Sequence, residues 1–336
     1  DETALAEAEV EYENHTSPSI YVKFPIAARR DELVGRGLLV PPDIEGGKVS
    51  VVIWTTTPWT LPANQAVCVH PDFDYALVRV GNEILLIAEQ LVESVAKACG
   101  FSHHEIVGKQ RGIDLGPTMN PLTCRRPFSD GLSPIVDGKF VTLEQGTGCV
   151  HIAPGHGQED YDLSRGYNSI ASQELQLKVF APVDSRGRFT EEVPEFQGLK
   201  VFEANPLINQ KLKEKGLLLN KVDDKQTHSY PHCWRCKHPV IFRATDQWFV
   251  SMDMVPMKDH KSLRQCALEE IDHRVRWIPK WGRDRIFGMV ENRPDWCLSR
   301  QRVWGVPIPG FSCRTCGEVL FSAELVEHVA KLVEKD

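Results

Sequence analysis

The sequence predicts a mixed α/β protein, in which a strand-rich unit with a few peripheral helices precedes a region of different composition. Between residues 45 and 150, short runs of β-branched and apolar residues alternate with turn residues, which is the pattern of consecutive strands. Beyond residue 230 the chain carries six of its eight tryptophans and becomes rich in arginine. We therefore divide the chain into an entry segment, a central domain and a final region, with the bounds 1–44, 45–225 and 226–336.

Strands are expected wherever apolar residues alternate or run together between turns. SIYVKF and KVSVVIWTTT have this character, and so do AVCVH, YALVRV and EILLIA, the last two joined by a hairpin turn at GNE. Helices are expected where apolar residues recur every three or four positions. These helices span 88–100, which ends in a capping glycine, and then 157–168, 201–218 and the last residues of the chain, where Ser322 is the expected N-cap.

Composition limits the class of protein. Apolar residues make up 42% and charged residues 25% of the 336 residues, as in soluble globular proteins, and no apolar run is long enough to cross a membrane. The net charge of −7 argues against a general nucleic-acid binder. RVRWIPKWGRDR is a local basic cluster, but basic runs of this kind are usually solvated faces. Because the first residue is not Met, we expect a piece of a longer protein.

Two polar residues stand out in GTGCVHIAPGHGQEDY, residues 146–161. His151 follows a short strand, and Asp160 comes after a glycine-rich loop, so the two can form one polar pocket wall that holds a water or an ammonium group. The alternative is a histidine that caps a strand and an aspartate that starts a helix. Cys149 and His151 share a strand face, but their side chains point in parallel and so do not form a nucleophile–base pair. Cys149 is therefore expected to be a small buried residue.

A second unusual segment is WTTTPWTLPAN, residues 54–64. Threonine hydroxyls both donate and accept hydrogen bonds, so Thr55, Thr56 and Thr57 can bind the hydroxyls of a terminal ribose. Trp59 offers a face on which a base or sugar can stack. An ordinary β-branched strand is the structural alternative.

Together these two segments resemble the editing domain of isoleucyl-tRNA synthetases, which are class I enzymes. SYPHCWRCKHPVIFRATDQWF and NRPDWCLSRQRVWGVPIP are similar to the same family where its chain returns to the catalytic core, so the resemblance covers nearly the whole sequence. The related leucyl and valyl enzymes typically have arginine after the threonine pair, whereas this chain reads TTTPWT. The resemblance implies a strand-rich, barrel-like editing domain followed by part of a Rossmann-type core.

The resemblance also implies roles for individual residues. The threonine run, Trp59 and Asn64 are implied to form the editing pocket, His151 to exclude a side chain one methylene longer than valine, and Asp160 to pair with the α-amino group of the misattached amino acid. No metal or covalent intermediate is implied for this hydrolysis. Trp296 and Trp304 are implied to help form the isoleucine pocket of the whole enzyme.

The activity implied for this chain is hydrolysis of Val-tRNA(Ile) by attack of a water on the ester at the 3′ end of the tRNA. Motifs similar to HIGH and KMSKS, which such enzymes need to handle ATP and Mg²⁺, are absent, so we do not expect synthetic activity from this chain alone. Two alternatives are a non-catalytic module that binds the tRNA acceptor end and an editing site of the valyl type that cleaves Thr-tRNA. We expect a cytoplasmic monomer that does not bind membranes.

Ten cysteines include two CxxC pairs. Cys233 with Cys236, and Cys313 with Cys316, have the spacing of zinc knuckles. Three readings stay open: each pair is half of a structural zinc site that other parts of a longer chain complete, as the family suggests; both pairs share one zinc; or neither binds metal. The remaining cysteines are single, which fits reduced thiols in the cytosol.

Overall fold

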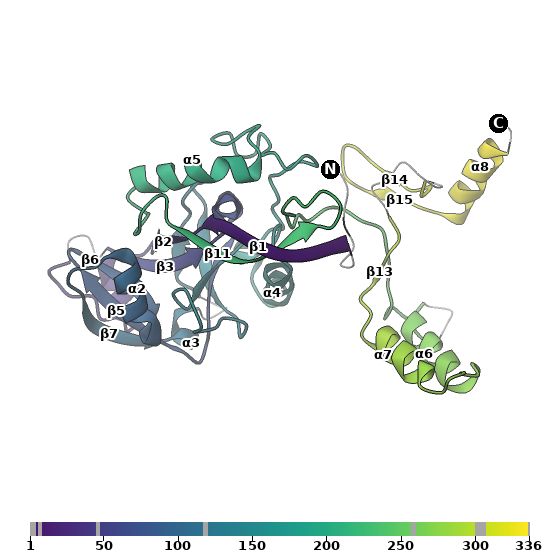
Figure 1. The fold of residues 1–336 in the computed structure, drawn as a ribbon, viewed down its shortest axis with the longest axis horizontal. Helices are drawn as coiled ribbons and strands as arrows, with labels where there is room; N and C mark the ends of the chain where they lie inside the picture. Colours follow the sequence, from purple (N-terminus) through teal and green to yellow (C-terminus); the bar gives the residue numbers. More distant parts are fainter. Residues whose placement is uncertain are drawn as a thin grey trace. The chain divides into compact units, whose positions relative to one another are not determined.

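A computed structural model of the chain describes residues 5, 9–44, 48–116, 120–256, 260–299 and 307–334. The chain forms two compact units, Leu5–Ala244 and Thr245–Asp336, and each is described by itself. Elements are labelled as in Figure 1. No helix among the described residues is both long and apolar enough to cross a bilayer.

The larger sheet of the first unit has five strands in the order β2-β3-β6-β5-β7. The pair β3/β6 is parallel and the other neighbours are antiparallel. Strand β3 lies inside the sheet and its first five residues are buried, which explains why VSVVI is apolar except for Ser50. The strands are β2 Ile20–Pro25, β3 Val49–Thr55, β5 Asp74–Val80, β6 Glu83–Ala88 and β7 Glu105–Arg111.

A second sheet has four strands in the order β10-β4-β9-β8, with bounds Cys149–Ile152, Ala66–Val69, Leu132–Asp137 and Thr123–Arg125. An isolated bridge between Ile26 and Cys124 links the edge of this sheet to the first. Among the described residues, the two larger sheets are thus open sheets linked at one edge, and no closed barrel forms. The prediction of a mixed α/β, strand-rich fold is confirmed, whereas the barrel-like closure that the resemblance implied is wrong for the described chain.

Helices cover the sheets of the first unit. The predicted helices appear as α2 Val92–Cys99, α4 Gln158–Asn168 and α5 Val201–Glu214, and Gly100 ends α2 in a left-handed conformation with φ of 69°. Shorter turns are α1 Arg30–Gly35, α3 Gly112–Leu115, and three 3₁₀ segments, η3 Pro58–Ala63, η4 Glu89–Leu91 and η5 Gln173–Leu175. Helix α5 lies along a two-stranded ribbon (Figure 1) made by β1 Val10–Pro18 and β11 Lys225–Cys233.

The ribbon brings together the two ends of the first unit, because β1 lies near the start of this unit and β11 near its end. After β11 the chain stays with this unit as far as Ala244, whose N–H donates to the carbonyl of Gly155 over 2.8 Å. Residues 226–244, which the sequence analysis groups with the final region, therefore pack within the first unit.

The described part of the second unit contains short antiparallel pairs and three helices. Helices α6 Leu263–His273 and α7 Gly282–Glu291 pack together, and Ser262 caps α6 in a reciprocal capping box with Gln265. Strands β12 Phe249–Val250 and β13 Trp296–Cys297 pair, as do β14 Phe311–Ser312 and β15 Val319–Leu320. Helix α8 Ala323–Val333 begins after Ser322, the predicted N-cap, whose Oγ accepts from Leu325 N–H. Within the described residues of this unit there is no parallel sheet of the Rossmann type.

Candidate active site

A pocket of about 270 Å³ lies in the first unit, beside the end of β3. It combines three threonine hydroxyls and one aspartate carboxylate of the predicted motifs with two imidazoles and three further aromatic rings. Its lining consists of Thr55, Thr57, Trp59, Thr60, His151, Ala153, His156, Asp160, Tyr230 and Phe242. The threonine run and the loop that carries His151 and Asp160 thus share one cleft, although they are about 90 residues apart in sequence.

The threonine run ends β3 and then turns sharply. Pro58 starts the 3₁₀ segment η3, where a residue without an N–H is well tolerated. The Thr57 N–H donates to Thr55 Oγ1 over 3.0 Å, which tightens the turn. As a result Thr55 and Thr57 line the pocket, whereas Thr56, the residue between them, is not among its lining residues.

Both ring nitrogens of His151 are engaged by protein groups. Asn64 Nδ2 donates to Nδ1 over 2.7 Å, and Nε2 lies 3.0 Å from Thr60 Oγ1. Thr60 uses its own hydroxyl hydrogen on the carbonyl of Thr57, so its oxygen accepts from His151 Nε2–H. The tautomer of His151 therefore carries its proton on Nε2, and the ring has no nitrogen left for a ligand.

Asn64 orients this histidine from behind. Its side-chain oxygen accepts from Ser133 Oγ over 2.5 Å, and Ser133 in turn accepts from Arg126 Nε. Asn64 is buried and does not line the pocket. A single directed chain of hydrogen bonds thus runs from Arg126 to the backbone of η3 and fixes the His151 ring.

Burial keeps this histidine neutral. His151 is 9% exposed, and desolvation, helped by the nearby His156, lowers its pKa to about 3. A neutral imidazole with both nitrogens occupied presents ring carbons to the pocket. Such a group restricts the shape of a bound ligand but has no free site for proton transfer.

Asp160 is held at the first turn of α4. Its Oδ2 accepts from the Ala153 N–H over 2.7 Å, and burial raises its pKa to about 6. The loop before it needs glycine for space: a Cβ on Gly155 would lie 2.2 Å from the Phe180 carbonyl oxygen, and one on Gly157 would lie 2.9 Å from Cγ of Asp160. Gly155 thus lets the loop pack against the Phe180 backbone, and Gly157 leaves space for the Asp160 carboxylate.

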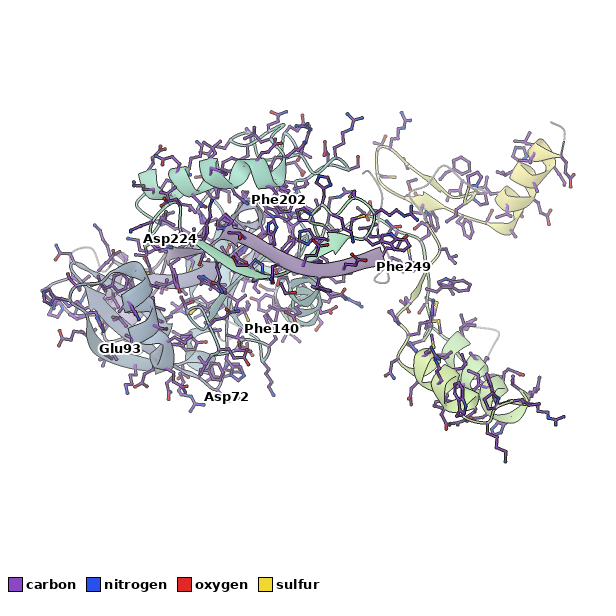
Figure 2. The ribbon with its side chains drawn as sticks, in the orientation of Figure 1. Asp72, Glu93, Phe140, Phe202, Asp224 and Phe249 are labelled. Atoms are coloured by element: carbon purple, nitrogen blue, oxygen red, sulfur yellow. The ribbon has the colours of Figure 1, made fainter. Side chains whose placement is uncertain are left out.

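Trp59 and His156 form an aromatic pair in the pocket wall. Their ring centroids are 4.9 Å apart at an interplanar angle of 74°, and Trp59 also meets Phe202 of α5, which is labelled in Figure 2. Because Trp59 is only 2% exposed, it is a buried wall rather than the open stacking face that the sequence suggested. His156 is also buried, and its Nδ1 bonds to the Phe242 carbonyl over 3.0 Å.

Sequence reasoning missed half of the lining. Thr60, Ala153 and His156 lie within the two motifs that it singled out, but their side-chain directions could not be read from the motifs. Tyr230 and Phe242 come from β11 and the segment after it, and only tertiary packing brings them to the pocket. The signal that was available was His156, the second histidine of the segment 146–161, which lies in its PGHG run.

Cys149, on strand β10, is buried, and desolvation raises the pKa of its thiol well above the ordinary value. This environment is that of an inert packed thiol, as the sequence analysis expected.

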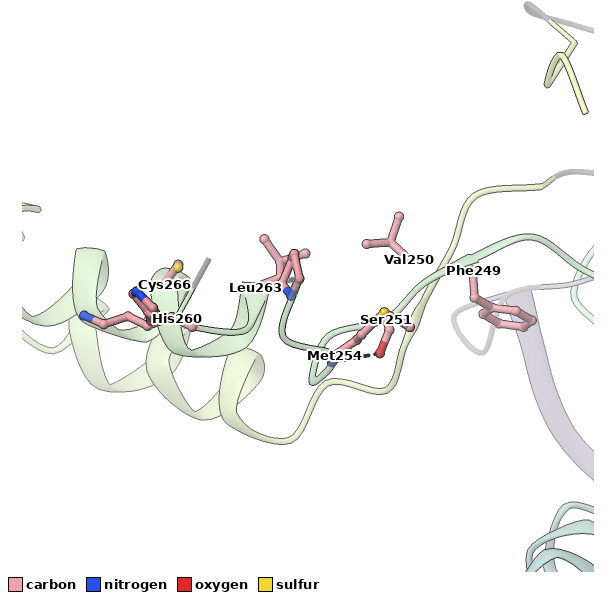
Figure 3. Close-up of a pocket in the computed structure, with 9 residues that line it drawn as sticks. Phe249, Val250, Ser251, Met254, His260, Leu263 and Cys266 are labelled. Carbon is pink, nitrogen blue, oxygen red and sulfur yellow. Dashed lines mark hydrogen bonds between the residues drawn. The ribbon is translucent and has the colours of Figure 1, made fainter. Parts of the chain in front are cut away.

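A larger cavity, of about 760 Å³, lies in the second unit around β12 and the start of α6 (Figure 3). Phe249, Met254 and Leu263 give it a mainly apolar lining, to which His260 and Lys261 add polar groups. Trp296 is on β13, opposite Val250, and is 48% exposed. Trp304, its expected partner in an amino-acid pocket, lies outside the described residues.

The two CxxC pairs occupy turns of one design. In each, the first cysteine N–H donates to the carbonyl five residues later, and the residue four positions on donates back to that cysteine. That fourth residue, Lys237 or Gly317, has a positive φ of 57° or 72°. Among the described residues, no group of three or more potential metal ligands comes together, so each turn offers its two thiols only.

Comparison with known proteins defines the class of this chain. Residues 1–336 match the family described as tRNA synthetases class I (I, L, M and V), and the chain belongs to that family. Its curated relatives include the isoleucine–tRNA ligases of Persephonella marina, 52% identical over 337 residues, and Petrotoga mobilis, 47% identical over 335 residues. Each match covers the whole of this chain and 32% of the relative, so the chain spans about a third of the length of these proteins.

Among solved structures, the editing domain of the P. knowlesi cytosolic leucyl-tRNA synthetase is similar to 68% of this chain and 99% of its own, with a TM-score of 0.47 and 13% identity.

Proposed function

We propose that the pocket hydrolyses the ester of a misattached amino acid at the 3′ end of tRNA, and that its substrate is Val-tRNA(Ile). The observation that supports this most directly is the pocket itself: a small cavity that combines hydroxyls, a rigid neutral imidazole and a buried carboxylate. The similarity to isoleucine–tRNA ligases supplies the amino acid and the tRNA.

Asp160 is the proposed partner of the α-ammonium group. With a pKa of about 6 its carboxylate is mostly ionised at neutral pH. Oδ2 is already used by the Ala153 N–H, but a carboxylate accepts several hydrogen bonds and therefore retains capacity for an ammonium group. A bound ammonium would also lower the pKa of this carboxyl, since opposite charge favours ionisation.

His151 is the proposed size gate. Because its ring is fixed by Asn64 and Thr60, it cannot swing aside without breaking two hydrogen bonds. A valyl side chain would fit against it, whereas the extra methylene of isoleucine would overlap with it. A second sieve of this kind is useful because one methylene is worth only about 1–3 kcal/mol in a hydrophobic pocket, and isoleucine against valine is the standard example.

The proposed chemistry needs only water. A water attacks the ester carbonyl carbon and a tetrahedral oxyanion forms, which hydroxyls and N–H groups of the threonine turn stabilise. The bond from that carbon to the ribose oxygen then breaks, the ribose oxygen takes up the proton that the attacking water has lost, and valine and free tRNA leave. Thr55 and Thr57 have hydroxyls at the pocket for this role, whereas the hydroxyl hydrogen of Thr60 is used on the Thr57 carbonyl.

Deacylation assays with the full chain test the proposal. We expect release of valine from Val-tRNA(Ile), none from Ile-tRNA(Ile), and loss of release in Asp160→Ala. Binding of tRNA without any turnover would favour the non-catalytic alternative, and faster cleavage of a threonyl than of a valyl ester would favour the valyl-type alternative. We further propose that the chain is a cytoplasmic monomer. Sedimentation of the purified chain measures its oligomeric state and so checks the second part.

In the longer protein, we propose that Trp296 and Trp304 belong to the pocket that selects isoleucine for ATP-dependent activation. ATP and Mg²⁺ then act only there, because this chain lacks motifs similar to HIGH and KMSKS. The expected result is no isoleucine-dependent exchange of pyrophosphate into ATP by this chain. Such exchange by the purified chain would contradict the assignment.

We also propose that the two CxxC turns are halves of structural zinc sites. Their common backbone geometry fits knuckles that each supply two thiols, and zinc in such sites takes four ligands and stabilises the fold. Cys233 and Cys236 would hold one ion, and Cys313 and Cys316 another, each with ligands from elsewhere in a longer chain. Metal analysis should find less than one tightly held zinc per chain. If the chain instead holds one zinc, and either Cys313→Ser or Cys233→Ser alone removes it, the shared site is favoured.

A further inference from the structure

Two polar atoms of the pocket wall have no hydrogen-bond partner among the described residues. They are Nε1 of Trp59 and Nε2 of His156, and both are buried. Buried polar groups are nearly always satisfied, so an orphan in a pocket wall points to a partner that the pocket receives from outside. The two rings are neighbours in the pocket wall, with centroids 4.9 Å apart, and a single partner is the simplest way to satisfy both atoms.

The chemistry of the two atoms defines that partner. The Phe242 carbonyl can only accept, so His156 donates to it from Nδ1 and leaves Nε2 as an acceptor. The indole of Trp59 can only donate. A partner must therefore donate to one ring and accept from the other. An ammonium group lacks the second capacity and a carboxylate lacks the first, whereas a hydroxyl or a water has both.

From this we propose that Trp59 and His156 hold an O–H group in the pocket, and that His156 accepts a hydrogen bond from this group during the hydrolysis. The O–H group belongs either to the attacking water or to the free hydroxyl of the terminal ribose. This inference rests on the proposed ester hydrolysis and adds His156 as a residue that contacts the reacting groups. His151 cannot take this part, because both of its nitrogens are occupied.

The surroundings of His156 suit an acceptor at neutral pH. Burial, with a contribution from the charge of Arg243, lowers the pKa of His156, while its bond to the Phe242 carbonyl opposes that change. The other titratable groups at the pocket are His151, Asp160 and Tyr230. Neutral His156 and ionised Asp160 are both needed, so two groups must lose protons before hydrolysis can proceed.

The decisive experiment compares His156→Phe with His156→Gln in single-turnover deacylation of Val-tRNA(Ile) by the full chain. Phenylalanine keeps the ring against Trp59 but has no acceptor, so we expect the rate to fall by about 100-fold. Glutamine can place its side-chain oxygen near the position of Nε2, and we expect it to retain the rate within about tenfold. His103→Gln, on an exposed histidine, is the matched control and should leave the rate unchanged.

The pH profile separates this role from a structural one. For the unmodified chain the logarithm of the rate should rise on the acid side with a slope approaching two, from His156 and Asp160. In His156→Gln the slope should fall to one, because only Asp160 still titrates. A slope that stays the same in the glutamine variant, or a phenylalanine variant with full activity, overturns the inference.

A substrate whose terminal ribose lacks the free hydroxyl locates the O–H group. If that hydroxyl is the partner, His156→Phe will cost nothing further on this substrate; if the partner is the water, the cost persists. If the unmodified chain does not hydrolyse Val-tRNA(Ile) at all, the proposed function is refuted. This outcome differs from failure of the His156 inference, in which the unmodified chain is active and the variants behave like it.

Discussion

Asp160→Asn should make the protein more stable at neutral pH. Folding raises the pKa of the Asp160 carboxyl from 3.8 to about 6, because the pocket desolvates it. The folded state therefore holds its proton more tightly than the unfolded state does. The contribution of this carboxyl to the free energy of unfolding is therefore fully present below about pH 4, and it is lost as the pH rises through about 6.

The size of the effect follows from the pKa values. Each pKa difference of one corresponds to 1.36 kcal/mol, so the ionised carboxylate costs the folded state about 3 kcal/mol above pH 7. Asparagine carries no charge, and its side-chain oxygen can still accept from the Ala153 N–H. We expect the free energy of unfolding of the variant to exceed that of the unmodified chain by up to about 3 kcal/mol at pH 8, which is roughly 6–12 °C in Tm for a unit of this size.

Urea unfolding at pH 4, 6 and 8 is the appropriate assay. The two proteins should agree at pH 4 and diverge as the pH rises, while the variant loses valyl-ester hydrolysis. Asp162→Asn, on an exposed carboxylate of the same helix, is the control and should show no such divergence. A variant that is less stable than the unmodified chain at pH 8, or a difference that does not change with pH, would refute the reasoning.

Three further substitutions test the pocket. Asn64→Ala leaves His151 Nδ1 without its donor, so we expect a loss of about 1–3 kcal/mol in urea unfolding and some cleavage of the isoleucyl ester; full stability would show that the network is dispensable. His151→Ala should allow hydrolysis of Ile-tRNA(Ile), and a variant that still spares this ester completely would contradict the gate. Gly157→Ala places a Cβ 2.9 Å from Cγ of Asp160, so valyl-ester hydrolysis should fall at least tenfold with little change in unfolding; an unchanged rate would mean that the carboxylate adapts.

The fold was predictable where local rules act alone. Strand β3, the β5/β6 hairpin and helix α2 with its glycine cap follow from apolar spacing and turn residues, which depend only on near neighbours in sequence. How the strands join into sheets depends on pairings between distant residues. The sequence therefore gave no sign that the two sheets meet at Ile26 and Cys124 without closing into a barrel.

The sequence by itself determined the chemical groups of the site: threonines in a turn, a histidine, and an aspartate behind close-packed glycines. Only the tertiary structure assigned their parts, because the direction of a side chain and the state of its nitrogens are set by residues far away in the chain. Asn64 and Thr60 occupy His151, which makes it a fixed wall, whereas Phe242, more than 80 residues further along, turns His156 into an acceptor. Two histidines of one short motif thus differ because their hydrogen-bond partners differ.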